Sequence, residues 1–504
     1  MKKLKSIETF LALVFMLFSI LLVVFSLKSN PFSQYLHGHD SSMFLYFGKG
    51  MSRGLIPYTD MFDHKGPVLF FIQYLATFLG DNLNLGIWII EVIWFSITCI
   101  VVFKTCTLFI NDQLLSSVAI MLNVGLIIRC FEGGNLSEQY ALLFIAIAFY
   151  LFNKLIQQST LSNFEYIVIG ISGALVFFIR ANMVALWLVY CLYLLITGLL
   201  NKEKKELLRQ VIFIFIGGIS VVILIILYGL VTNSLSDMIQ QAFLMNIKYA
   251  SVSITEKIGA GTKFFEFLNL AGIFFFIVVY LIYFLGLERK TIVFKQNTLL
   301  ILYFVVNFYT VFVSGRFYLH YLTTQLVVVI ILTAQVLKYL SERNSNVKIR
   351  IPIALLMLSL TMFFNLETFS KYTKVINTRV SVEKKYVQEV SNFIVENTES
   401  EDSIYVHNIN ANLYLLSGRF ANSRYFVLPS LNYQKFPELS QEFSEELINN
   451  PPKIVIVKQS FKDSSDNKTN LNYQLAQVIN KSYEEVQATN DPGAYIVYKY
   501  IGNK

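Results

Sequence analysis

Long apolar stretches recur along most of the chain, separated by short polar connections. A helix that crosses a membrane needs about 20 mostly apolar residues. On that criterion the sequence predicts eleven spans, near residues 9–27, 85–103, 114–130, 139–154, 164–180, 183–200, 210–231, 268–287, 298–314, 322–339 and 351–367. The first stretch is too long for a signal peptide and no small-residue cleavage site follows it, so we interpret it as a retained span.

A further apolar run, at 68–80, is short and is bracketed by Pro67 and Gly80. We therefore expect it to lie in the membrane interface or to be re-entrant. Counting it as a span would reverse the side of every later loop, and cytoplasmic loops carry an excess of Lys and Arg. Eleven spans place the N-terminus and the basic cluster at 202–209 in the cytoplasm and leave the outer loops poor in Lys, whereas twelve do not.

Three larger pieces then lie outside: a first loop at 28–84, a second at 232–267, and a tail from 368 onward. The tail alternates helix-like stretches at 382–398, 438–449 and 470–480 with the strand-like runs IYVHN, KIVIVK and AYIVYKY. The sequence thus predicts a membrane all-α domain at 1–367 and a small extracytoplasmic α/β domain at 368–504. The protein is expected in the cell membrane, with a cytoplasmic N-terminus.

The composition agrees with a polytopic membrane protein, since 55% of the 504 residues are hydrophobic and only 15% are charged. The net charge of +8 is explained by orientation in the membrane and does not indicate nucleic-acid binding. All four cysteines lie in or beside apolar stretches without paired spacing, so no disulfide is predicted.

Ionisable residues gather at the outer ends of the predicted spans. The candidates for function at this depth are His39, Asp40, Asp60, His64, Lys65, Glu132, Glu138, Arg180, Arg316 and His320, with Asp63 and His37 beside them. Glu91 is the only plain carboxylate well inside a span, whereas a coupled transporter would be expected to show more charge near the midplane.

Each candidate has a structural alternative. Asp40 is either the N-cap of a helix or a catalytic carboxylate mounted at a helix start, and the two roles are compatible. Arg180 and Arg316 are either phosphate ligands or interfacial anchors for the ends of spans. Arg316 and His320 are four residues apart, so a helix there would place them on one face.

The ordered set of motifs resembles the GT-C superfamily, and within it the family 39 glycosyltransferases, which include protein O-mannosyltransferases and the aminoarabinose transferases that modify lipid A. The resemblance rests on Asp40, the downstream stretch GLIPYTDMFDHKGP, the acidic outer loop EGGNLSE at 132–138 and the basic turn RAN at 180–182. Two features depart from the family pattern. Lys65 is followed by Gly66 and Pro67 instead of two prolines, and the loop at 132–138 offers Glu132 and Glu138 where many relatives carry Asp.

The resemblance implies an inverting transfer of a sugar from a polyprenyl-phosphate donor to a cell-envelope glycan, lipid or protein at the outer membrane face. Asp40 would be the base that deprotonates the acceptor hydroxyl. Arg180, Arg316 and Lys65 would bind the donor phosphate. The remaining residues expected to contact substrate are His39, Asp60, His64, Glu132, Glu138 and His320. The Lys, Asn, Ile and Phe richness suggests a low-GC bacterium, in which the carrier would be undecaprenyl phosphate.

Two other functional classes remain open, a flippase for lipid-linked sugars and a non-catalytic assembly protein of the envelope. A flippase is expected to show inverted repeats and polar midplane sites, and neither is clear in the sequence. No cofactor is predicted. His39, Asp40, His64 and Glu132 are residue types that bind divalent cations, but no tight ligand spacing supports a metal site.

Overall fold

The computed structural model describes residues 2–79, 83–249, 252–289, 291–342, 366, 381–427, 437–464, 471–489 and 494–502. The chain forms two units. Unit 1 comprises 1–31, 88–228 and 247–376, and unit 2 comprises 32–87, 229–246 and 377–504. The boundary predicted at 367/368 lies outside the described residues.

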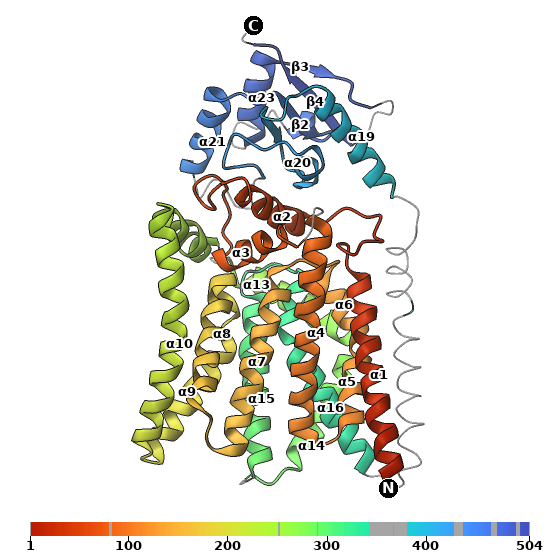
Figure 1. Ribbon diagram of the computed structural model, residues 1–504, viewed down its shortest axis with the longest axis vertical. Coiled ribbons are helices and arrows are strands. Elements are labelled where there is room, and N and C mark those ends of the chain that lie inside the picture. The colour runs from red at the N-terminus through yellow and green to blue at the C-terminus, as the bar shows by residue number, and fades with distance from the viewer. Residues whose placement is uncertain are drawn as a thin grey trace. The chain divides into compact units, whose positions relative to one another are not determined.

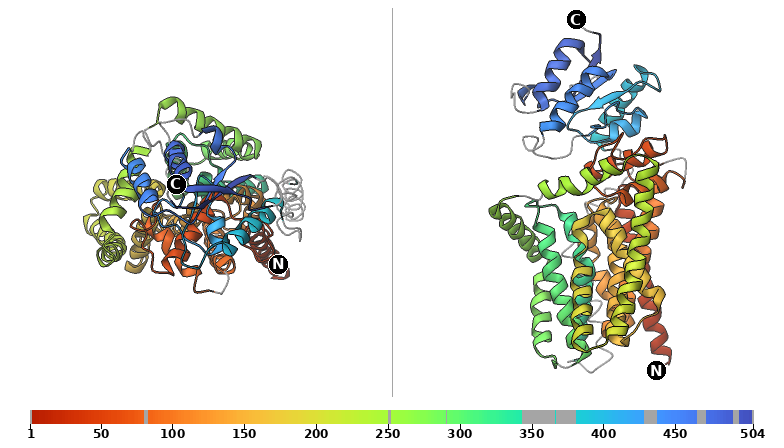
Figure 2. Two further views of the ribbon diagram at one scale, coloured as in Figure 1. Left: turned by 90° about the horizontal axis from the view of Figure 1, so that it is seen from above. Right: turned by 90° about the vertical axis from the view of Figure 1, so that its left-hand side faces the viewer.

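Unit 1 is a bundle of long helices that run side by side (Figures 1 and 2). Its elements are α1 (Lys2–Ser26), α4 (Leu83–Ile110), α5 (Gln113–Leu122), α6 (Val124–Phe131), α7 (Ser137–Gln158), α8 (Asn163–Ile179), η1 (Ala181–Met183), α9 (Ala185–Leu200), α10 (Lys204–Val231), α12 (Met245–Tyr249), α13 (Ile254–Leu270), α14 (Ile273–Leu285), α15 (Ile292–Phe312), η3 (Leu319–Gln325) and α16 (Leu326–Glu342). In the described part, six helical stretches are long and apolar enough to cross a membrane, or up to eight if each of two bent pairs is one span. The chain is thus a multi-pass membrane protein.

Several predicted spans differ in detail from the helices. The span at 114–130 is the pair α5 and α6, bent by 44°, and the span at 268–287 falls on the pair α13 and α14, bent by 87°. The first bend occurs at Asn123, whose amide donates to the Ala119 carbonyl (2.8 Å) and to the Thr333 hydroxyl (3.2 Å). The helices α8 and α9 have only 17 and 16 residues. The expected span at 351–367 lies outside the described residues, apart from position 366.

Burial within unit 1 distinguishes central from peripheral helices. In the most apolar 18 residues of the stretch formed by η3 and α16, 94% are buried inside the protein. In the most apolar 18 residues of α10, only 17% are buried. Close contact between α8 and α10 depends on Gly170, because a Cβ atom there would collide with the Ile214 carbonyl. Small residues of this kind let helices approach closely where lipid gives no hydrophobic drive for association.

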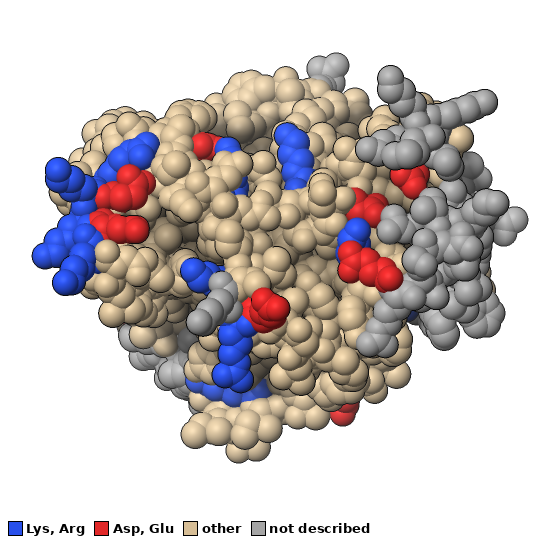
Figure 3. Space-filling model, turned by 90° about the horizontal axis from the view of Figure 1, so that it is seen from below, with Lys and Arg blue, Asp and Glu red and all other residues tan. Residues whose placement is uncertain are grey.

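Basic side chains gather at one end of the bundle, below α9 and α10 (Figure 3). The sequence there contains Lys202, Lys204, Lys205 and Arg209, at the turn between these helices and in the first turns of α10. Under the positive-inside rule, this end is the one expected to face the cytoplasm.

Unit 2 contains α2 (His39–Met51), α3 (Pro67–Ala76), α11 (Leu235–Ile239), the π-helical turn η2 (Gln240–Leu244), α19 (Val382–Glu396), β1 (Ile404–Val406), α20 (Asn412–Ser417), α21 (Pro437–Asn449), β2 (Ile454–Lys458), α22 (Phe461–Ser464), α23 (Leu471–Ser482), β3 (Tyr483–Val486) and β4 (Tyr495–Tyr500). The strand order is β1-β2-β4-β3, with β1 parallel to β2 and the other pairs antiparallel. Ile404 pairs with Ile454, and Val455 with Tyr498. The three strands and three helices predicted in the tail are present, and β3, α20 and α22 add to them.

One hydrophobic core joins segments of unit 2 that are far apart in the sequence. Phe62 from the first loop and Met245 from the segment after α10 belong to the same buried cluster as Tyr425, Phe443 and Val455 of the tail. Segments that share a core lie on the same side of a membrane. The loop, the segment at 229–246 and the tail are therefore on one side, as the predicted topology requires. The helix α3, with ten residues, accounts for the apolar run that was expected not to span.

Candidate functional site

The first turn of α2 carries Asp40. Gly38 occupies the N-cap position, and Asp40 is the second residue of the helix, so the interpretation of Asp40 as the N-cap is wrong. A carboxylate in the first turn is still favoured by the helix dipole, by about 0.3–1 kcal/mol. The direction of α2 is fixed by packing on α3, where the rings of Phe47 and Phe70 stack with centroids 3.8 Å apart.

Asp63, His64 and Lys65 form a compact polar group in the loop before α3. Oδ1 of Asp63 accepts a hydrogen bond from the backbone N–H of Lys65 (2.9 Å) and lies 3.8 Å from the Lys65 ammonium. The ammonium is also 3.2 Å from Nε2 of His64. The Tyr58 hydroxyl donates to the Lys65 carbonyl (2.7 Å), so the backbone of this loop is held in place.

Asp63 is almost completely buried and is coupled to its charged neighbours. Burial raises the pKa of the Asp63 carboxyl, Lys65 opposes this effect, and the negative charge of Asp40 adds to it. The Lys65 ammonium lies 5.8 Å from the centre of the Phe44 ring, one turn after Asp40. The structure thus brings Asp40, Asp63 and Lys65 into one electrostatic group. Asp63 has no role in the sequence-based hypothesis, although its spacing from Lys65 is that of an Asx turn.

Two other predicted residues of unit 2 lie at its surface. His39 begins α2 with an exposed side chain. Asp60 is also exposed, and its Oδ2 accepts the backbone N–H of Ile56 (2.7 Å). The Asp60 carboxylate therefore stabilises the turn that leads to Tyr58, whose φ is +74°.

In unit 1, four predicted residues are joined into one network through Tyr321. The Arg180 guanidinium, at the end of α8, pairs with Glu138 in the first turn of α7. It also donates to the Tyr321 hydroxyl (2.8 Å) and lies 4.5 Å from the centre of that ring. The neighbouring residue, His320, contacts the Glu132 carboxylate through Nδ1. Tyr321 and Glu138 therefore already orient the Arg180 guanidinium, and Glu138 balances its charge. An anionic ligand would have to bind the guanidinium beside Glu138 or displace the Glu138 carboxylate from it.

The loop after α6 is held by Glu91. Four consecutive residues, 132–135, have positive φ values of 48°, 96°, 93° and 58°. Glu91 accepts hydrogen bonds from the backbone N–H of Asn135 (2.6 Å) and from the Gln139 amide (3.1 Å). A Cβ atom at Gly134 would collide with the Glu91 carboxylate. The lone carboxylate noted inside a span thus shapes the loop that carries Glu132, a role that its own sequence surroundings do not reveal.

Arg316 lies in the loop after α15. The helical element η3 begins only at Leu319, so no helix places Arg316 and His320 on one face. Arg316 follows Gly315, whose φ is +69°, and its side chain is exposed, while that of His320 is buried.

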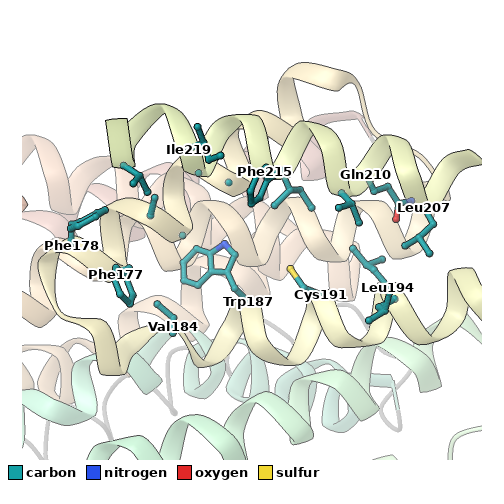
Figure 4. A pocket seen from close by; sticks show the side chains of 18 residues that line it. Phe177, Phe178, Val184, Trp187, Cys191, Leu194, Leu207, Gln210, Phe215 and Ile219 are labelled. Carbon is teal, nitrogen blue, oxygen red and sulfur yellow. The ribbon is translucent and has the colours of Figure 1, made fainter. Parts of the chain in front are cut away.

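An apolar pocket of about 500 Å³ lies among α8, α9 and α10 (Figure 4). Phe178, Trp187, Cys191, Leu194 and Phe215 point into it from the three helices. Such a volume falls within the range of about 300–1,000 Å³ that is typical of small-molecule sites. The lining suits a hydrocarbon ligand. Among the described residues, no group of three or more His, Cys, Asp or Glu side chains could hold a metal ion.

Family comparisons cover nearly the whole chain. Residues 2–382 match the family described as "Putative competence-induced protein Ccs4 N-terminal domain", and residues 384–500 match the corresponding Ccs4 C-terminal domain family. A sequence comparison with curated proteins finds no significant match.

Solved structures of ArnT from Cupriavidus metallidurans resemble the fold. The structure bound to undecaprenyl phosphate matches with a TM-score of 0.63 at 11% identity, and the apo structure with 0.58 at 10%. Each match covers 96% of this chain and 97% of the other. The predicted resemblance to the GT-C superfamily is confirmed at the level of the fold.

Proposed function

Since the chain belongs to the Ccs4 family and shares its fold with ArnT, we propose that it is a glycosyltransferase that uses a polyprenyl-phosphate sugar. The observation that carries this proposal is the match over 96% of the chain to ArnT bound to undecaprenyl phosphate. The acceptor is a cell-envelope glycan, lipid or protein, and transfer takes place at the outer face of the membrane.

Asp40 is the proposed general base. A carboxylate on a rigid helix start can take the proton of an acceptor hydroxyl, which then attacks the anomeric carbon and inverts it. The packing of α2 on α3 supports this role because it holds the first turn in one direction. The negative charge of Asp40 raises the pKa of the buried Asp63 carboxyl, so the two carboxylates interact electrostatically, and Lys65 partly offsets their repulsion.

Lys65, Arg180 and Arg316 are the proposed ligands of the donor phosphate, whose charge grows as the glycosidic bond breaks. Arg180 is supported best, because Tyr321 and Glu138 hold its planar fork in one orientation before substrate binds. The residues proposed to contact the sugar or the acceptor remain His39, Asp60, His64, Glu132, Glu138 and His320.

The pocket of Figure 4 is the proposed site for part of the polyprenyl tail. Its apolar lining and its position among membrane helices suit an isoprenoid chain, and its volume corresponds to a portion of such a chain. This assignment explains why Phe177, Phe178 and Val184, which flank the Arg180 turn in the sequence, line the pocket.

The experiment is single-turnover transfer by purified protein in detergent, with a panel of synthetic polyprenyl-phosphate sugars as donors. We expect Asp40→Asn to lose about 10²- to 10⁴-fold of the rate, the usual contribution of acid–base catalysis, while donor binding is kept. Glu401→Gln, at an exposed carboxylate of the tail that has no proposed role in substrate binding, is the control for the loss of a surface carboxylate. A flippase or an assembly protein would tolerate Asp40→Asn, so near-normal function of that variant would refute the proposal.

A further inference from the structure

The turn of α2 that bears Asp40 is hydrogen-bonded to the tail. The Asn412 amide donates to the His37 carbonyl (3.0 Å), just before the helix. The backbone N–H of Ala411 donates to the Ser42 hydroxyl (3.0 Å), two residues after Asp40. Two bonds from one short segment of the tail thus bracket the carboxylate along the chain.

The groups that form these bonds are shielded from water. Ser42 is completely buried and Asn412 is 2% exposed. The Asn412 amide also donates to Oδ1 of Asn410 (2.9 Å), which fixes the orientation of its side chain. A buried, oriented donor of this kind holds its acceptor more firmly than a surface contact would.

The rest of α2 is embedded in the same part of the tail. The Tyr46 ring stacks on Phe426 with centroids 4.0 Å apart, and its hydroxyl accepts the N–H of Ala421 (3.1 Å). The Lys49 ammonium donates to the Leu415 carbonyl (3.1 Å) near the other end of the helix. The helix that carries the proposed base is therefore a structural element of the tail domain as well as of the first loop.

We propose that the tail segment 410–412 positions the base, and that Asn412 is a positioning residue for the transfer reaction. This inference rests on the proposed function, in which Asp40 accepts the proton. The tail segment 410–412 thereby contributes to the chemical step without itself contacting the substrate. A misplacement of about 1 Å in a catalytic group can cost on the order of 100-fold in rate.

The test compares two changes at Asn412 with a matched control. Asn412→Ala removes the amide, and Asn412→Asp keeps its shape but replaces the donor with an acceptor, so that packing is separated from hydrogen bonding. The control is Asn397→Ala, another tail amide, which donates to the Phe393 carbonyl (2.9 Å) and accepts from the Lys499 ammonium (3.2 Å). Its bonds join α19 and β4 and do not involve α2.

Two readouts are needed. Hydrogen exchange of peptides that span residues 37–46, measured on the full-length protein, reports whether the first turn of α2 opens. We expect faster exchange there in both Asn412 variants and not in the control. Single-turnover transfer should fall by about 10- to 100-fold in both variants, with the donor concentration for half-saturation unchanged.

A double-mutant comparison separates positioning from general destabilisation. If Asn412 acts through Asp40, then adding Asn412→Ala to Asp40→Asn should cause no further loss of transfer. Additive loss, or unchanged exchange at 37–46, would overturn the proposal. Near-normal transfer by Asp40→Asn alone would instead refute the proposed base, and the exchange data would still report whether the hydrogen bonds hold the turn.

Discussion

Acidification should loosen the segment that follows β1, because His407 is buried there as a neutral imidazole. Its Nε2 lies 2.7 Å from Oδ1 of Asn472, and its Nδ1 lies 3.1 Å from the Tyr405 hydroxyl. Since an amide oxygen can only accept, the shorter contact, to Asn472, requires the proton on Nε2, although the Asn408 amide nitrogen also lies 3.2 Å from that atom. Burial lowers the pKa of His407 to about 4, and the bond to Asn472 opposes the shift.

The size of the effect follows from the difference between the folded and unfolded states. An unfolded histidine has a pKa of 6.5 and takes up a proton as the pH falls below that value, whereas folded His407 stays neutral until about pH 4. The stability that His407 contributes is complete above pH 6.5 and is lost as the pH falls toward 4. Between pH 7.5 and 5 the loss is about 2 kcal/mol, or about 30-fold in the opening equilibrium.

Hydrogen exchange of peptides spanning 404–412 is the appropriate assay, with the intrinsic pH dependence of exchange subtracted. The three tryptophans, Trp88, Trp94 and Trp187, lie in α4 and α9, so tryptophan fluorescence would not report on the tail. In the His407→Gln variant, which cannot titrate, the extra opening at pH 5 should disappear. If wild type and variant showed the same change in protection between pH 7.5 and 5, the reasoning would be refuted.

Three further outcomes are expected. Arg180→Lys should raise the donor concentration for half-saturation by about 10-fold or more with normal membrane insertion, because a single ammonium cannot replace the planar fork; full activity would leave Arg180 as an anchor. Cys191, in the pocket of Figure 4, should be protected from an apolar thiol reagent by a polyprenyl phosphate, and equal labelling with and without the lipid would exclude the pocket as its site. Gly134→Ala should lower thermal stability, by about 1–3 kcal/mol, because φ is +93° there and the added methyl meets Glu91; an unchanged melting temperature would contradict this.

The sequence predicts the long elements well because their signals are local. A run of about 20 apolar residues indicates a membrane helix wherever the rest of the chain lies, and six such stretches are present in the described part. In the tail, β2 and β4 have dense apolar runs and were predicted. The strand β3 was not, because Glu484 and Glu485 stand in the middle of its four residues and only its pairing with β4 makes it a strand.

The sequence indicates which residues belong to the candidate site but not how they are arranged. Glu132, Glu138, Arg180 and His320 are brought together, yet Tyr321, which joins them, has no signal of its own in the sequence. The roles of Asp63 and Glu91 depend on surroundings that only the fold supplies. Asp63 is affected by its burial, and Glu91 acts through its hydrogen bond to the backbone of the loop at 132–135. Arg316 shows the converse, since its spacing from His320 is helical but the helix starts three residues later.

The bonds between α2 and the tail also set an order for biosynthesis. Ser42 and Ala411 are separated by 369 positions, and at about 5–20 residues per second the ribosome needs roughly 20–75 s to synthesise the chain between them. Throughout that time Tyr46 lacks Phe426, the ring on which it stacks in the finished protein. The first loop therefore completes its packing only after the tail has been synthesised. A premature stop codon near the 3′ end of the message would leave it permanently incomplete and exposed to proteolytic quality control.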